Sequence, residues 1–147
     1  MNFPIISALI LLPTTGSLFL FFSKSNDDKN LTVKYVALFT SVVNFLLSIY
    51  LWFLFDPSTS EFQFVEDRNW LLGLVNYKVG IDGISILFII LTTFITPLCI
   101  ISVNNTIKVR LRDFLIAILI MESFMIGVFC SLDLIVFYLF FEAGLIP

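Results

Sequence analysis

Two glutamates in otherwise apolar sequence are the residues of this chain best suited to do chemistry. Glu122 lies nine residues after Asp113, and Glu142 lies nine residues after Asp133. At a rise of about 1.5 Å per residue, each glutamate would lie roughly 13–14 Å into a helix that begins at the preceding aspartate. Both are equidistant from Leu132, the centre of the expected turn between the helices. We therefore expect the two carboxyls at about the same depth on neighbouring helices.

An ionised carboxylate in the middle of a bilayer is costly, so such a group is expected to be protonated, paired with a cation or facing water. A carboxyl that changes between these states can take up and release a proton. Glu142 and Glu122 are therefore predicted to handle protons. The alternative is a protonated glutamate that hydrogen-bonds across helices and contributes only to packing. Lys34, at a helix start, is the sole lysine in the apolar runs, so a cation partner is expected from outside the chain.

Composition supports a membrane setting and excludes several classes of function. The 147 residues are 59% hydrophobic and 13% charged, and histidine is absent. The lack of histidine argues against most zinc and haem sites, and the few basic residues are not massed for nucleic acid. Cys99 and Cys130 lie within apolar runs and are predicted to be buried free thiols. No phosphate-binding glycine loop, nucleophile–base pair or cofactor motif occurs, so the chain is expected to have no catalytic or redox site and to bind no cofactor or metal.

The elements that must position these glutamates are apolar runs of about 20 residues, the length that crosses a bilayer. They predict an all-α membrane protein with about five transmembrane helices in a single membrane domain over residues 1–147. The predicted helices cover residues 3–22, 31–55, 83–103, 113–130 and 133–147. Proline at positions 13 and 97 is expected to kink its helix. The N-terminus has no basic region before its apolar run, so it is expected to be a first membrane helix rather than a cleaved leader.

A polar segment over residues 56–81 separates the second and third helices. The alternation in "EFQFVED" and "YKVGI" predicts two short strands, as a hairpin on the membrane surface. Asp82 and Asp133 precede helices and are predicted to be N-caps, which accept hydrogen bonds from the first free amides. For Asp82 a functional role is the alternative.

Basic residues predict the orientation of the chain. Six of the eight flank or fill the first and third connections: Lys24, Lys29, Lys34, Lys108, Arg110 and Arg112. Arg68 and Lys78 lie in the polar segment at the opposite end. By the positive-inside rule, the first and third connections face the matrix or cytoplasm, and residues 56–81 with the N-terminus face outward.

Two long stretches resemble a known family. "YKVGIDGISILFIILTTFITPLCIIS" and "DFLIAILIMESFMIGVFCSLDLIVFYLFFEAGLIP" are similar to the N-terminal third of the NADH dehydrogenase subunit 4 family. These are antiporter-like membrane subunits of respiratory complex I. "FPIISALILLP" and "EDRNW" fit the same region, so the resemblance covers essentially the whole chain.

The resemblance implies about fourteen helices in the full subunit, with inverted repeats of five, and a role in proton pumping driven by ubiquinone reduction elsewhere in the complex. The family's key glutamate falls on Glu142, which is expected to pair with a lysine on a later helix. Glu122 corresponds to a position that is acidic in some members. NADH, FMN, iron–sulfur clusters and ubiquinone are expected in other subunits. Partners are expected to be the other membrane-arm subunits and the lipid bilayer.

The family continues for hundreds of residues after the point matching Pro147. Residues 133–147 would form about 22 Å of helix, short of the roughly 30 Å that a span needs. The expectation is therefore that a second polypeptide continues the subunit, or that the sequence is a piece of a longer chain. Either would supply the partner lysine.

The expected location is the mitochondrial inner membrane, as a multi-pass and organelle-encoded protein. The abundance of Phe, Ile, Asn and Lys favours an AT-rich organelle genome. A bacterial inner membrane is the alternative. Two other functions stay open at this point: a subunit of a related sodium–proton antiporter complex, and a purely structural membrane subunit.

Overall fold

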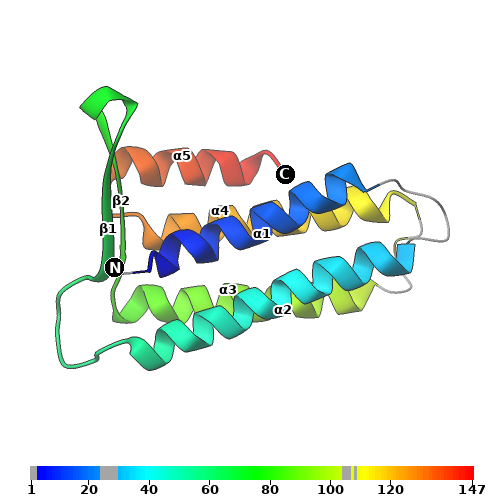
Figure 1. The fold of residues 1–147 in the computed structure, drawn as a ribbon, viewed down its shortest axis with the longest axis horizontal. Coiled ribbons are helices and arrows are strands. Elements are labelled where there is room, and N and C mark those ends of the chain that lie inside the picture. The colour runs from blue at the N-terminus through cyan, green and yellow to red at the C-terminus, as the bar shows by residue number, and fades with distance from the viewer. Residues whose placement is uncertain (1–2, 24–29, 104–106, 108) are drawn as a thin grey trace.

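The computed structural model describes residues 3–23, 30–103, 107 and 109–147. Within these ranges the chain forms five α-helices and one hairpin (Figure 1). The helices are α1 (Ile5–Phe22), α2 (Asn30–Leu54), α3 (Gly83–Ser102), α4 (Leu111–Cys130) and α5 (Leu134–Leu145). Observed and predicted helix ends differ by at most two residues.

Four of the helices, α1 to α4, are long and apolar enough to cross a membrane. The predicted helical membrane fold is thus confirmed, with α5 as a shorter apolar helix of 12 residues. Both α1 and α3 continue as helices through their internal prolines, Pro13 and Pro97.

The core of the bundle consists of two apolar clusters at opposite ends of the helices. The cluster nearer the hairpin centres on Ile6, Leu9, Leu51, Ile86, Ile89 and Ile126. The cluster nearer the first and third connections centres on Leu20, Val33, Ala37, Ile100, Leu115 and Leu119. Both draw on α1 to α4, so apolar contacts hold these four helices together at each end and leave a middle zone between them.

The two strands expected within residues 56–81 form an antiparallel hairpin. It consists of β1 (Gln63–Trp70), a 3₁₀ turn η2 (Leu71–Gly73) and β2 (Val75–Ile81). Gly73 adopts a φ of 83°, in the left-handed region that glycine enters without steric cost. The hairpin lies across the ends of the helices, at the same end of the bundle as the N-terminus (Figure 1).

The hairpin also binds the turn between α4 and α5. The Leu132 N–H donates to the Lys78 carbonyl at 3.0 Å, and Val79 forms an isolated antiparallel bridge with Ser131. Because this turn precedes α5 directly, β2 determines where α5 begins.

Arg112 joins the end of α1 to the start of α4, at the end of the bundle opposite the hairpin. Its Nη1 donates to the Ser23 carbonyl at 2.8 Å, so the start of α4 lies beside the end of α1. Arg68 and Lys78 lie on the hairpin at the other end. Of the residues that predict the orientation, Lys24, Lys29 and Lys108 lie outside the described residues. The arrangement separates the remaining basic residues in the way that the positive-inside pattern requires.

Gly127 allows α4 and α5 to approach closely. A Cβ at this position would come within 2.7 Å of the Phe140 ring, whereas a Cβ at Gly83 would meet nothing within 4 Å. We expect Gly127→Val to destabilise the protein by about 1–3 kcal/mol through overpacking. Thermal unfolding of the purified protein in detergent measures this. Gly83→Val is the matched control, and equal stability of the two variants would contradict the packing role.

Candidate functional site

Glu122 turns into the middle of the bundle and contacts an amide on a neighbouring helix. Its side chain is 2% exposed, and Asn44 on α2 is fully buried. Asn44 Nδ2 donates to Glu122 Oε1 at 2.9 Å. Glu122 is buried because it continues the i, i+3, i+4 stripe of α4 that also contains Leu119 and Ile126. Asn44 lies on the α2 face that also carries buried Ser41 and Ser48.

Other buried polar side chains join the helices in the same middle zone. Ser48 and Thr93 share a hydrogen bond of 2.8 Å between α2 and α3. Ser123 on α4 donates to the Ile10 carbonyl at 2.5 Å and pairs with Thr14 on α1 at 2.9 Å. We call this set the central polar layer: Thr14, Asn44, Ser48, Thr93, Glu122 and Ser123. It connects all four long helices between the two apolar clusters.

Glu142 lies in a different environment, on the exposed side of α5. No hydrogen bond or ion pair joins it to Glu122 within the described ranges. Phe124, two residues after Glu122, contacts Phe140 and packs near Gly144, and these two residues flank Glu142. The two carboxyls therefore lie at similar depths along neighbouring helices, as the spacing predicts, but they point to different surroundings.

Both predicted N-caps are confirmed. Asp82 Oδ1 accepts from Ser85 N at 2.7 Å and from Ile84 N at 3.1 Å. These hydrogen bonds hold the pKa of Asp82 below its usual value, and the one from Ser85 has the larger effect. Asp133 Oδ1 accepts from Ile135 N at 2.8 Å in the same way. Capping accounts for the contacts of both aspartates.

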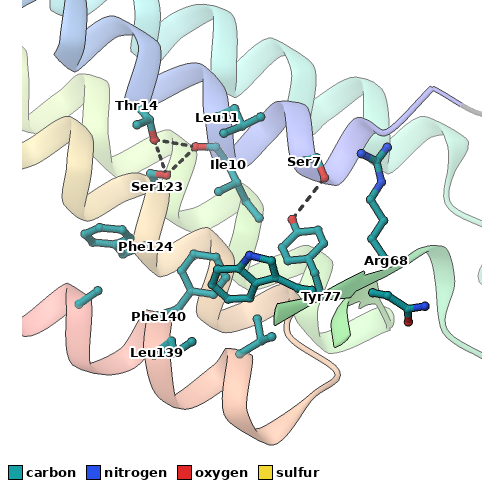
Figure 2. A pocket seen from close by; sticks show the side chains of 14 residues that line it. Ser7, Ile10, Leu11, Thr14, Arg68, Tyr77, Ser123, Phe124, Leu139 and Phe140 are labelled. Atoms are coloured by element: carbon teal, nitrogen blue, oxygen red, sulfur yellow. Dashed lines mark hydrogen bonds between the residues drawn. The ribbon is translucent and has the colours of Figure 1, made fainter. Parts of the chain in front are cut away.

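A groove of about 750 Å³ runs between α1, α4, α5 and the hairpin (Figure 2). At the hairpin end, the hydroxyls of Ser7 and Tyr77 face each other at 3.2 Å. Burial raises the pKa of Tyr77, so its hydroxyl stays neutral. Ser7 lies in the first turn of α1, and both its N–H and its hydroxyl donate hydrogen bonds to the carboxylate of Glu66 in β1. A carboxylate suits this place because the amides of a helix N-terminus are free.

The two hydroxyls of Thr14 and Ser123 line the same groove farther along α1 and α4. Both residues belong to the central polar layer, so the groove reaches this layer. Most of the remaining lining is apolar, with Leu11, Phe124 and Phe140 among its residues.

Sequence reasoning missed Asn44 and Ser123. Asn44 is the one amide in the run "VKYVALFTSVVNFLLSIYLWFL", and the argument that singles out an acid in apolar sequence applies to it as well. Ser123 carries no such signal, because serine commonly bonds to the backbone of its own helix. The prediction of two buried thiols is right for Cys130 and wrong for Cys99, which is exposed on α3.

Glu122 is the one ionisable side chain of the central polar layer, whose other members are hydroxyls and an amide. The described residues contain no group of three or more His, Cys, Asp or Glu side chains that could hold a metal ion. The described salt bridges, from Arg110 and Arg112 to Asp113, lie at the start of α4.

Comparisons with known proteins identify relatives along nearly the whole chain. NADH-ubiquinone oxidoreductase chain 4 of Marchantia polymorpha is 45% identical over 97% of the chain. NADH-quinone oxidoreductase subunit M of Rhodobacter capsulatus is 55% identical over 82% of the chain, and that of Rickettsia conorii is 47% identical over 100% of the chain. No family model matches the chain. The chain spans 28%, 23% and 31% of the length of these three relatives, respectively.

The cap at Asp82 predicts a pH-dependent contribution to stability. Replacing an N-cap aspartate with alanine costs about 1 kcal/mol, so Asp82→Ala should lower the thermal midpoint of the protein in detergent. Because the folded-state pKa is depressed, this contribution is present above the unfolded-state value of about 3.9 and is lost as the pH falls through the folded-state pKa. The variant and the wild type should therefore converge only in strong acid.

Asp82→Asn is the control, because its side-chain oxygen still caps the helix while its charge is removed. A difference between Asp82→Ala and wild type that grows on acidification would contradict this assignment.

Proposed function

The chain belongs to the family of NADH-ubiquinone oxidoreductase chain 4 and NADH-quinone oxidoreductase subunit M, as a counterpart of their N-terminal part, and we propose that it works in the proton-translocating membrane arm of complex I. The observation that carries the proposal is an identity of 45–55% with these subunits over 82–100% of the chain. The buried carboxyl in the central polar layer supports it, because ionisable groups inside membrane bundles commonly serve ion or proton paths.

Glu142 is proposed to be the proton-coupled acid of this segment. Its carboxyl is the one charged group on an otherwise apolar helix, whose single buried residue is Val136. The exposed apolar residues of α5 include Leu134, Ile135, Tyr138, Phe141 and Leu145. This surface leaves room for further helices of the subunit beside Glu142. A lysine on one of those helices would stabilise the ionised carboxylate, and its departure would favour proton uptake.

Glu122 is proposed to be a second proton-carrying residue. Its depth along α4 is similar to that of Glu142 on α5, which supports transfer between the two helices through intervening water or hydroxyl groups. Ser123, which follows Glu122 in the sequence, forms a hydrogen bond with Thr14, and both line the groove that α5 also lines. In this proposal the chain's own residues hold, orient and pass protons, and they take no part in electron transfer.

The redox chemistry is proposed to occur in other subunits, which would bind NADH, FMN, iron–sulfur clusters and ubiquinone. The remaining part of the subunit, as a second chain or as a continuation of this one, would supply the partner lysine. Other membrane-arm subunits and the bilayer complete the surroundings. The proposed location is an inner membrane, either mitochondrial or bacterial. The relatives reported above come from a plant and from bacteria.

Two other functions are less favoured. A subunit of a sodium–proton antiporter complex would share the helical fold, but the relatives reported above are named as subunits of NADH oxidoreductases. In a purely structural subunit, Glu142 would contribute to assembly of the complex and would not transfer protons.

We expect Glu142→Gln to reduce proton translocation coupled to NADH oxidation at least tenfold in the assembled complex, because glutamine cannot ionise. Proton uptake by inverted membrane vesicles, divided by the rate of NADH oxidation, measures this. Glu61→Gln is the matched control: it removes the same charge from an exposed residue of the polar segment and should leave translocation unchanged.

Normal translocation by Glu142→Gln in the fully assembled complex would contradict the role of this residue. Glu142→Ala separates the structural alternative, which requires impaired assembly together with normal translocation by the complex that does assemble.

A further inference from the structure

The hydrogen bond between Asn44 and Glu122 leaves two buried oxygens without a donor. Asn44 Nδ2 donates to Glu122 Oε1. The remaining oxygens of the two groups, Asn44 Oδ1 and Glu122 Oε2, are buried and have no hydrogen-bond partner among the residues that the structure describes. Both are acceptors when Glu122 is ionised. Because unsatisfied buried acceptors are destabilising, these two oxygens require at least one further donor.

Neighbouring hydroxyls do not supply this missing donor, because each already donates its proton to another group. Ser41 and Ser48 lie on the same face of α2 as Asn44, and they donate to backbone carbonyls of their own helix at 2.9 and 2.7 Å. Ser123, beside Glu122, donates to a carbonyl of α1 at 2.5 Å. The missing donor therefore has to be a proton or a molecule that enters the α2–α4 interface.

The charged groups of the surrounding helices do not supply it either. Helices α1 and α3 contain no acidic or basic residue. Lys34 on α2 and Arg112 on α4 precede Asn44 and Glu122 by ten residues each, which is about 15 Å along a helix. Glu142 on α5 is itself an acid, so its charge cannot neutralise that of an ionised Glu122. The other titratable side chains of these helices, none of which hydrogen-bonds to Glu122 within the described residues, are Tyr35, Tyr50, Cys99, Asp113, Cys130 and Tyr138.

We propose that Glu122 carries a proton and forms a neutral acid–amide pair with Asn44, which acts as its positioning residue. Protonation converts the carboxylate into a carboxylic acid that is both donor and acceptor, so it supplies the missing donor and removes the buried charge. Asn44 Nδ2 meanwhile fixes the orientation of Glu122 by holding Oε1. The reaction is uptake of one proton by one carboxylate, with no other bond changed.

This inference rests on the proposed function in that it assigns the resting state of one of the proposed proton-carrying acids. Loss of the proton would leave an uncompensated charge in the α2–α4 interface. Proton release by Glu122 therefore has to be accompanied by the approach of water or of a cation to Asn44 and Glu122.

Infrared spectroscopy of the assembled membrane complex at neutral pH tests the proposal. A carboxylic-acid C=O stretching band should be present in the wild type and lost in Glu122→Gln. Asn44→Leu should shift this band to higher frequency, because the carbonyl loses its donor. Ser48→Ala, which removes a polar group one turn farther along the same face of α2, is the matched control and should leave the band in place.

The variants are chosen so that they assemble. The side chain of the Glu122→Gln variant offers a donor and an acceptor, as a carboxylic acid does. Where Asn44→Leu fails to assemble, Asn44→Gln moves the same amide by one methylene group and should shift the band as well.

A spectrum in which no carboxylic-acid band depends on Glu122 would overturn the proposal, because the residue would then be ionised. A band that stays unshifted in the Asn44 variants would overturn the role of Asn44. Proton translocation is measured separately. A Glu122→Gln complex that lacks the band and still pumps normally would refute the proposed transport role of Glu122 while supporting its protonated state.

Discussion

The requirement that buried polar groups find partners determines the middle of this structure. Water is scarce inside an apolar bundle, so Asn44 and Glu122 must pair with each other. The same requirement joins Ser48 to Thr93 and Ser123 to α1. These bonds hold four helices in a common register, because none of them can slide without leaving a polar group unpaired. The apolar clusters at either end supply contact area, whereas the central polar layer supplies specificity.

The hairpin performs a related task at one end of the bundle. Glu66 binds the first turn of α1, and β2 binds the turn between α4 and α5. Segments that are distant in the sequence are thereby held around a single groove, with α1 and α4 on one side and α5 on the other (Figure 2). The contact between β2 and this turn fixes where α5 begins, and with it the position of Glu142. The position of the proposed proton-coupled acid therefore depends on a polar segment outside the helices.

Much of this fold follows from local sequence, and the central pairing does not. Runs of about 20 apolar residues have few alternatives to helix in a membrane, and Asp82 and Asp133 mark helix starts because their carboxylates satisfy free amides. The depth of Glu122 follows from counting residues. The identity of its partner, Asn44, does not follow from the sequence. The face that α4 turns toward α2 depends on packing among helices that are far apart in the sequence. Likewise, spacing alone does not show that Glu142 is exposed while Glu122 is buried.

Purification from native membranes tests whether this chain works within an NADH-oxidising membrane complex. The chain would be captured in mild detergent with an antibody against the exposed hairpin turn, and the captured material assayed for NADH:quinone oxidoreduction and identified by mass spectrometry. We expect the chain to be recovered with NADH-oxidising subunits and with polypeptide matching the rest of chain 4. Recovery of the intact chain in a stable complex without NADH-oxidising subunits would contradict this expectation.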